Sequence, residues 1–166
     1  MSVYSTRFGS LKQYEKGKIE IINDDPRNYA FSNVFEVASK SAPYEKVVVG
    51  KNLQYVIEAI RAEGTSPWYA ADHDEFVVVM DGNVEVELVK LTNASAVVAP
   101  GTVGAVLVKG EPVGNRMGRI KLGRGHQALL PKGAAYRFKA EQPSCMIQQG
   151  ILGALSVEKW ADICYR

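Results

Sequence analysis

From residue 46 onward, short apolar runs alternate with turn residues, a pattern typical of an all-β protein. The run 47–49 ends at Gly50, and the run 76–80 ends at Asp81-Gly82. Beyond that pair, Val84, Val86 and Leu88 alternate with Glu85, Glu87 and Lys90, which indicates a strand with one apolar and one polar face. Asp-Gly between two such runs predicts a type I′ hairpin, because this turn needs positive φ at both central positions.

The segment 53–61 fits two different periods. Its apolar positions Leu53, Tyr55, Ile57 and Ala59 alternate with polar Gln54, Glu58 and Arg61, whereas Leu53, Val56, Ile57 and Ile60 also follow a helical period. β-branched and aromatic residues favour strands, and the neighbouring runs are strands. We therefore predict a strand here.

Three further segments complete the expected organisation. Residues 1–45 are polar and irregular but rich in aromatic residues, so we expect an arm that packs either on the barrel of residues 46–166 or on a partner subunit. Residues 92–118 contain many Gly and Pro and indicate a loop insertion with a short strand inside it. Near the end, Ser156 is a candidate N-cap for a short helix whose Val157, Trp160, Ile163 and Cys164 share one face.

Composition narrows the functional classes. The chain has 166 residues, 46% hydrophobic content and a net charge of +2, as expected for one globular domain. Basic residues are scattered, so the sequence shows no electrostatic footprint for nucleic acid. No apolar run is long enough to span a bilayer, no signal-peptide core is present, and Cys145 and Cys164 have no paired spacing. We expect a cytoplasmic protein with free thiols that binds small molecules or other proteins.

Two stretches resemble the paired signature of the cupin superfamily. Gly64, Glu75 and Gly82 match the landmarks of the first signature, and Gly125, Pro131 and Gly133 match those of the second. The turn residues at Gly82 and at Pro131-x-Gly133 predict hairpins that close the barrel. The resemblance implies an all-β, cupin-type double-stranded β-helix (jelly-roll) barrel, with an irregular N-terminal arm and a short C-terminal helix.

The positions at which that superfamily holds its metal carry other side chains. The His-x-His pair falls on Tyr69 and Ala71, or on Trp68 and Ala70, and the third histidine is replaced by Tyr136. Of the family's three imidazoles and one carboxylate, only Glu75 remains. Alanine has no donor atom, and a tyrosine phenol is a poor ligand for a divalent metal. We therefore expect this chain by itself to hold no metal.

One substitute metal site is conceivable, built from His73, Glu75 and His126. His73 and Glu75 are two residues apart in a strand and can face the same side. His126 lies several residues down its strand from the barrel mouth, roughly 10 Å or more at about 3.3 Å per residue. This geometry argues against the site but leaves it open.

At the expected mouth of the barrel remain Trp68, Tyr69, Glu75 and Tyr136. They either fill the vacated cavity, as barrel interiors without a ligand require, or line a small-molecule pocket or an interface. His73 is a further candidate for the pocket or the interface.

In the segments 66–75, 77–84 and 117–120 the chain resembles the small subunits of two-component hydroquinone 1,2-dioxygenases. The resemblance implies a hetero-oligomer of small and large cupin subunits, with two copies of each as one arrangement, in which the large subunit holds non-haem Fe(II). The implied reaction is cleavage of hydroquinone by O₂ to 4-hydroxymuconic semialdehyde. The small subunit would then orient residues and exclude water, with Trp68 the first candidate. A self-contained metal-dependent cupin and a metal-free ligand-binding module remain the alternatives.

Overall fold

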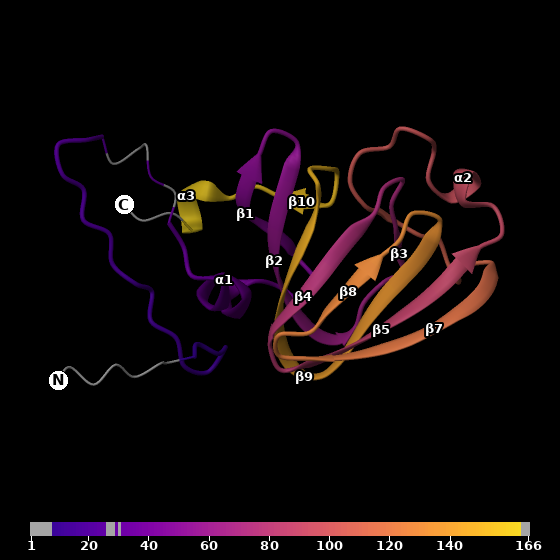
Figure 1. Ribbon diagram of the computed structural model, residues 1–166, viewed down its shortest axis with the longest axis horizontal. Coiled ribbons are helices and arrows are strands. Elements are labelled where there is room, and N and C mark those ends of the chain that lie inside the picture. Colours follow the sequence, from indigo (N-terminus) through magenta and orange to yellow (C-terminus); the bar gives the residue numbers. More distant parts are fainter. Residues whose placement is uncertain (1–7, 26–28, 30, 164–166) are drawn as a thin grey trace.

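The computed structural model describes residues 8–25, 29 and 31–163, and nearly all of its regular structure is β (Figure 1). The strands are β1 (Lys46–Asn52), β2 (Tyr55–Thr65), β3 (Tyr69–Ala70), β4 (Glu75–Asp81), β5 (Asn83–Leu91), β6 (Val106–Leu107), β7 (Gly114–Gly123), β8 (Gln127–Leu130), β9 (Ala134–Ile151) and β10 (Ser156–Val157). The helices are α1 (Val34–Lys40), α2 (Ala94–Val97) and α3 (Trp160–Ile163). Within the described part of the chain, no helix has the length and apolar character needed to cross a bilayer.

Strand β9 organises the sheet because it belongs to two layers. Its C-terminal half pairs with β2 on one side and β4 on the other, and its N-terminal half pairs with β3 and β5. The strand β8 extends the first layer through β4, and β7 extends the second through β5. The sheet therefore curls around a common interior, which confirms the cupin-type jelly-roll barrel (Figure 1).

The interior is filled by side chains from both layers. Among the largest fully buried ones are Tyr136, Phe138, Ile60, Leu130 and Met146. The predicted alternation in β5 is confirmed, since Val84, Val86 and Leu88 are buried while the residues between them are more exposed.

The predicted strand at 53–61 is confirmed as β2, but its inner and outer faces are exchanged. Leu53 lies in the turn before β2, and Tyr55 and Ile57 are exposed on the outer face. The inner face carries Val56, Glu58, Ile60 and Ala62, all buried. Apolar alternation pointed to the wrong face because the inner row contains a carboxylate and the outer row contains apolar residues.

Both predicted hairpins are wrong. β4 pairs with β8 and β9, and β5 pairs with β7 and β9, so Gly82 connects the two layers. Its φ is +82°, and a Cβ there would lie 2.2 Å from Ser144 Oγ, which explains the glycine. Asp81 has no positive φ, which excludes a type I′ turn. The Pro131-x-Gly133 turn likewise crosses from β8 in one layer to β9 in the other.

The segment before the barrel contains one helix that the sequence interpretation missed. α1 begins after Asn33, whose Oδ1 accepts a hydrogen bond from Phe35 N at 2.9 Å. Val37 of α1 packs against Val47 and Ala59 on the outside of the barrel. In Figure 1 the described residues before α1 form an extended, irregular segment beside the barrel.

The loop and the C-terminal helix differ in detail from the expectation. A short strand does lie within the loop as β6, but regular structure resumes at Gly114, so the insertion is shorter than predicted. Ser156 is not a helix cap: it belongs to β10, pairs with Lys46, and donates through Oγ to Glu58 Oε1 at 2.6 Å. The helix begins only at Trp160, and Cys164 lies outside the described residues.

Candidate functional site

The structure brings four of the five predicted site residues together and separates the fifth. Tyr69 of β3 pairs directly with Tyr136 of β9, and their ring centroids are 5.6 Å apart. Glu75 opens β4 beside them, and His73 Nε2 lies 3.5 Å from Glu75 Oε1. Trp68 precedes Tyr69 in an extended segment and therefore points to the opposite side. It belongs to a second apolar cluster.

Inside the barrel, polar side chains form a continuous hydrogen-bonded network. Tyr136 Oη donates to Glu75 Oε2 at 2.5 Å. Gln148 Nε2 donates to Glu75 Oε2 and to Tyr136 Oη, both at 3.0 Å. Gln148 Oε1 in turn accepts from Lys46 Nζ at 2.9 Å. Such a network fixes each member in one orientation, because every buried polar group depends on its neighbour.

Lys46 is the cation of this network, and its side chain is almost completely buried. Its Nζ lies 3.6 Å from Glu58 Oε2 and 5.1 Å from the centroid of the Tyr69 ring. Glu58 also accepts the hydrogen bond from Ser156 already described. A buried ammonium thus pairs with Glu58 on β2 and favours the charged form of Glu75 on β4, in the region where cupins place their metal.

The surroundings lower the pKa of Glu75 and raise the pKa values of Glu58 and Tyr136. Burial alone would raise the pKa of Glu75, but His73, Lys46 and the Tyr136 hydroxyl favour its carboxylate, so its pKa is lowered. Burial also dominates at Glu58, where Lys46 and Ser156 compensate only in part, so its pKa is raised. Burial and the adjacent Glu75 raise the pKa of Tyr136 well above its usual value, so its phenol stays protonated as a donor.

These residues do not fit an iron ion. A cupin metal needs several imidazole or carboxylate donors around an open position. Here Tyr136 is protonated, Ala71 has no donor, and the Lys46 ammonium repels a second cation. Glu75 is the only member of the familiar ligand set, and both of its oxygens already face other groups.

The alternative site of His73, Glu75 and His126 is not formed. His126 lies in the turn between β7 and β8, where its Nδ1 accepts from Gly123 N at 3.0 Å and its carbonyl accepts from Val79 N. Val79 is four residues along β4 from Glu75, about 13 Å at 3.3 Å per residue. Over the described residues, no group of three His, Cys, Asp or Glu side chains could hold a metal.

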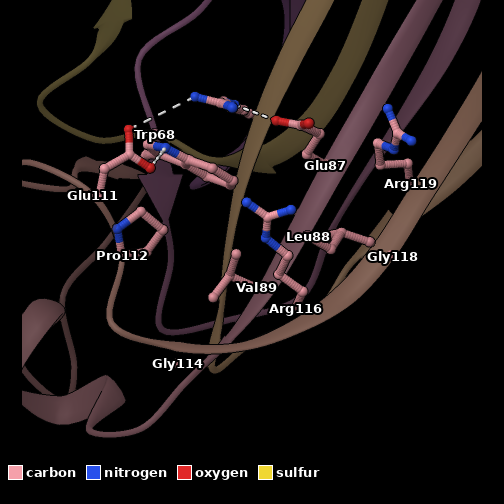
Figure 2. A pocket seen from close by; sticks show the side chains of 11 residues that line it. Trp68, Glu87, Leu88, Val89, Glu111, Pro112, Gly114, Arg116, Gly118 and Arg119 are labelled. Carbon is pink, nitrogen blue, oxygen red and sulfur yellow. Dashed lines mark hydrogen bonds and ion pairs between the residues drawn. The ribbon is translucent and has the colours of Figure 1, made fainter.

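Trp68 lines a separate pocket of about 400 Å³ on the outside of the β5–β7 layer (Figure 2). The Trp68 side chain packs on Val89, Leu91 and Ala135, and 8% of the residue remains exposed. Arginine and glutamate side chains from β5, β7, β9 and the loop before β7 surround it: Glu87, Glu111, Arg116, Arg119 and Arg137. The pocket thus combines one aromatic ring with several charged groups.

Sequence reasoning missed Lys46, Glu58, Gln148 and Arg137. Lys46 and Glu58 gave a usable signal, since each alternates with buried residues, Val48 in β1 and Val56 and Ile60 in β2. Opposite charges on the inward-facing sides of two adjacent strands indicate a buried ion pair. The partners of Gln148 and Arg137 depend on strand register, which the sequence does not contain.

Two solved structures contain chains very similar to this one. The crystal structure of hydroquinone 1,2-dioxygenase from Sphingomonas sp. TTNP3 with 4-hydroxybenzoate bound includes a chain 60% identical, with 98% of both chains covered and a TM-score of 0.94. A chain of hydroquinone 1,2-dioxygenase PnpCD, in complex with Cd²⁺ and 4-hydroxybenzonitrile, is 54% identical over 99% of this chain and 98% of that chain, with a TM-score of 0.92.

A second kind of chain in these enzymes shares only the fold. The match to a chain of PnpCD in complex with Fe³⁺ covers 87% of this chain but only 40% of the PnpCD chain. The identity is 12% and the TM-score is 0.62. No protein-family model matches the sequence, and no curated protein matches it. The near full-length identity to two enzymes of one kind is decisive: the chain belongs to the hydroquinone 1,2-dioxygenase family.

Proposed function

We propose that this chain is the noncatalytic small subunit of a cytoplasmic, Fe(II)-dependent hydroquinone 1,2-dioxygenase. The complete enzyme joins hydroquinone and O₂ to give 4-hydroxymuconic semialdehyde, and a larger cupin subunit holds the iron. The observation that carries the proposal is the barrel interior. Lys46, Gln148 and Tyr136 occupy the volume around Glu75, so the described residues keep the barrel but offer no donor set for iron in it.

The comparisons support a partner of the proposed kind. In PnpCD, a chain about twice the length of this one shares its fold at a TM-score of 0.62, so the same enzyme contains a short and a long chain of related architecture. We infer a hetero-oligomer with the long chain, with two copies of each as one arrangement. Within the arm of residues 1–45, α1 packs on the barrel, whereas Phe8 and Ile22 before it are more than 70% exposed, which supports a contact of that part of the arm with the partner.

Within this assembly we assign different roles to the predicted site residues. Tyr69, Glu75 and Tyr136 are each less than 5% exposed. This burial supports the interpretation that they fill the barrel interior, and not that they line a pocket or an interface. His73 is partly exposed and stays with Glu75 at the rim. Trp68 is the residue that we place at the boundary between the subunits, because it lines a pocket that opens to solvent. There it helps to exclude water from the aromatic substrate.

The test is to express this chain with and without the larger chain of the same enzyme. Iron content and hydroquinone-dependent O₂ uptake are then measured for each preparation. The proposal expects iron and turnover only in the co-expressed complex, and poor solubility of the isolated chain, whose interface is exposed. Iron and turnover in the isolated chain would overturn it. A stable homodimer that binds a phenol without turnover, and ignores the larger chain, would favour a ligand-binding module.

A further inference from the structure

Charged groups hold the indole of Trp68 on one face and at its N–H edge. The Arg137 guanidinium lies over the ring, 4.5 Å from its centroid. The indole Nε1 donates to Glu111 Oε2 at 3.1 Å. Apolar side chains of the second cluster support the rest of the ring. The face of the indole is thus contacted from β9, and its N–H edge is contacted from the loop before β7.

Arg137 is itself held in place by two carboxylates. Its Nε donates to Glu87 Oε2, and the two residues are direct neighbours across β5 and β9. Its Nη1 lies 3.9 Å from Glu111 Oε1. Glu111 therefore contacts both the guanidinium and the indole, and the three side chains form a closed set. Figure 2 shows Trp68 beside Glu111, with Glu87 across the pocket.

The properties of the guanidinium explain why an arginine serves here. A planar guanidinium can stack on an indole face while its edge donates to carboxylates, whereas a lysine ammonium supplies only a point charge. Glu111 is mostly exposed, so little besides Trp68 and Arg137 holds its side chain. The guanidinium and Glu111 thus fix the face and edge of the indole that the apolar cluster leaves uncovered.

We propose that Arg137, together with Glu111, is a positioning residue that sets the orientation of Trp68 at the subunit boundary. The proposal rests on the proposed function, in which Trp68 borders the substrate site of the assembled enzyme. Arg137 need not touch substrate. Its effect on turnover passes through the indole.

The test uses the co-expressed complex and two readouts. Kinetics of hydroquinone-dependent O₂ uptake are measured for Arg137→Met, Arg137→Lys, Glu111→Gln and Trp68→Ala. The matched control is Arg124→Gln, which removes an arginine–carboxylate pair with Asp81 (2.6 Å) outside this pocket. For the spectroscopic readout, the isolated small chain, refolded if necessary, carries Trp160→Phe, so that Trp68 is its only tryptophan.

We expect Arg137→Met to raise acrylamide quenching of Trp68 and to lower kcat/KM about five- to tenfold, the loss that corresponds to one partly exposed cation–π contact. Arg137→Lys should restore part of the rate but not the shielding of the indole face. Glu111→Gln should give an intermediate loss, and Arg124→Gln should match the parent in both readouts.

Four results would overturn the positioning role. Unchanged quenching and rate in Arg137→Met would show that the indole does not depend on the guanidinium. An equal loss in Arg124→Gln would show that the effect follows from the loss of any surface arginine–carboxylate pair. A large loss in Trp68→Ala with normal kinetics in Arg137→Met would overturn the positioning role and leave the proposed function intact. Full activity of Trp68→Ala would instead remove Trp68 from the proposed function, and the positioning role with it.

Discussion

Replacing Lys46 with methionine tests the buried ion pair most sharply. Methionine has similar length but no charge, so Glu58 loses its counter-ion while it remains 3% exposed. Breaking a buried pair by removing one partner costs about 3–5 kcal/mol. That is a large part of the roughly 5–15 kcal/mol that holds a domain folded. The hydrogen bond from Ser156 at 2.6 Å offsets only part of the loss.

The stability lost in Lys46→Met should also depend on pH, and it should grow as the pH rises. Burial already raises the pKa of Glu58, and the loss of Lys46 removes the main influence that lowers it. Above a pH of about 4.3 the unfolded chain ionises this carboxylate, whereas the folded variant keeps it protonated. The stability of Lys46→Met therefore falls as pH rises from 5 to 8, by at most about 1.4 kcal/mol per pH unit for this group.

The assay is urea denaturation of the purified chain, followed by tryptophan fluorescence at both ends of this pH range. The control is the double variant Lys46→Met/Glu58→Gln, which removes both charges and should recover much of the loss. A loss in Lys46→Met that is the same at pH 5 and pH 8, and is not relieved by Glu58→Gln, would refute the ion-pair reasoning.

Two further substitutions and one labelling experiment have clear expected outcomes. Tyr136→Phe removes the donor to Glu75 and should cost about 1.5–3 kcal/mol in urea denaturation while the pKa of Glu75 rises, as followed by carboxylate NMR; an unchanged pKa would contradict the network. Gly150→Ala places a Cβ 2.4 Å from Glu75 Oε1, so it should destabilise the fold, and Gly50→Ala, with 3.8 Å of clearance, is the control; equal losses would refute the steric argument. Burial raises the pKa of Cys145 to about 12, so native protein at pH 8 should resist iodoacetamide at this residue in peptide mass spectrometry and react only when unfolded; rapid labelling of the native chain would disprove the burial.

The barrel was predictable because turn residues and alternation carry much of the information. Gly82, Gly133 and Pro131 mark real turns, yet each connects two layers and not two paired strands. Turn chemistry specifies a reversal of direction, but β2, β3, β4 and β5 all pair with β9, which comes late in the chain. The α1 helix carried a weak signal, with Asn33 as cap and Glu36 three residues later, within an otherwise irregular segment.

The sequence predicted the site residues that fall on the metal-ligand positions of the cupin signature, and it missed the others. Tyr136 was expected in place of a histidine, and it does lie beside Glu75. Glu58 was assigned to the outer face because carboxylates are seldom buried. It is buried because Lys46 of β1 and Ser156 of β10 contact it, and the alternation of Lys46 and Glu58 with buried residues was the one signal for this pair. Trp68 was expected at the barrel mouth with Tyr69, but it faces its own pocket and not the barrel interior, and its role at an interface stays a prediction.

The central claim is that this chain binds no iron and depends on a larger cupin subunit for turnover. The most direct measurement is the iron content of the isolated chain after anaerobic incubation with Fe(II) and removal of free metal, in parallel with the co-expressed complex. We predict substoichiometric iron in the isolated chain, and iron in proportion to the larger subunit in the complex. One iron per small chain, retained after gel filtration in the absence of the larger subunit, would contradict the account.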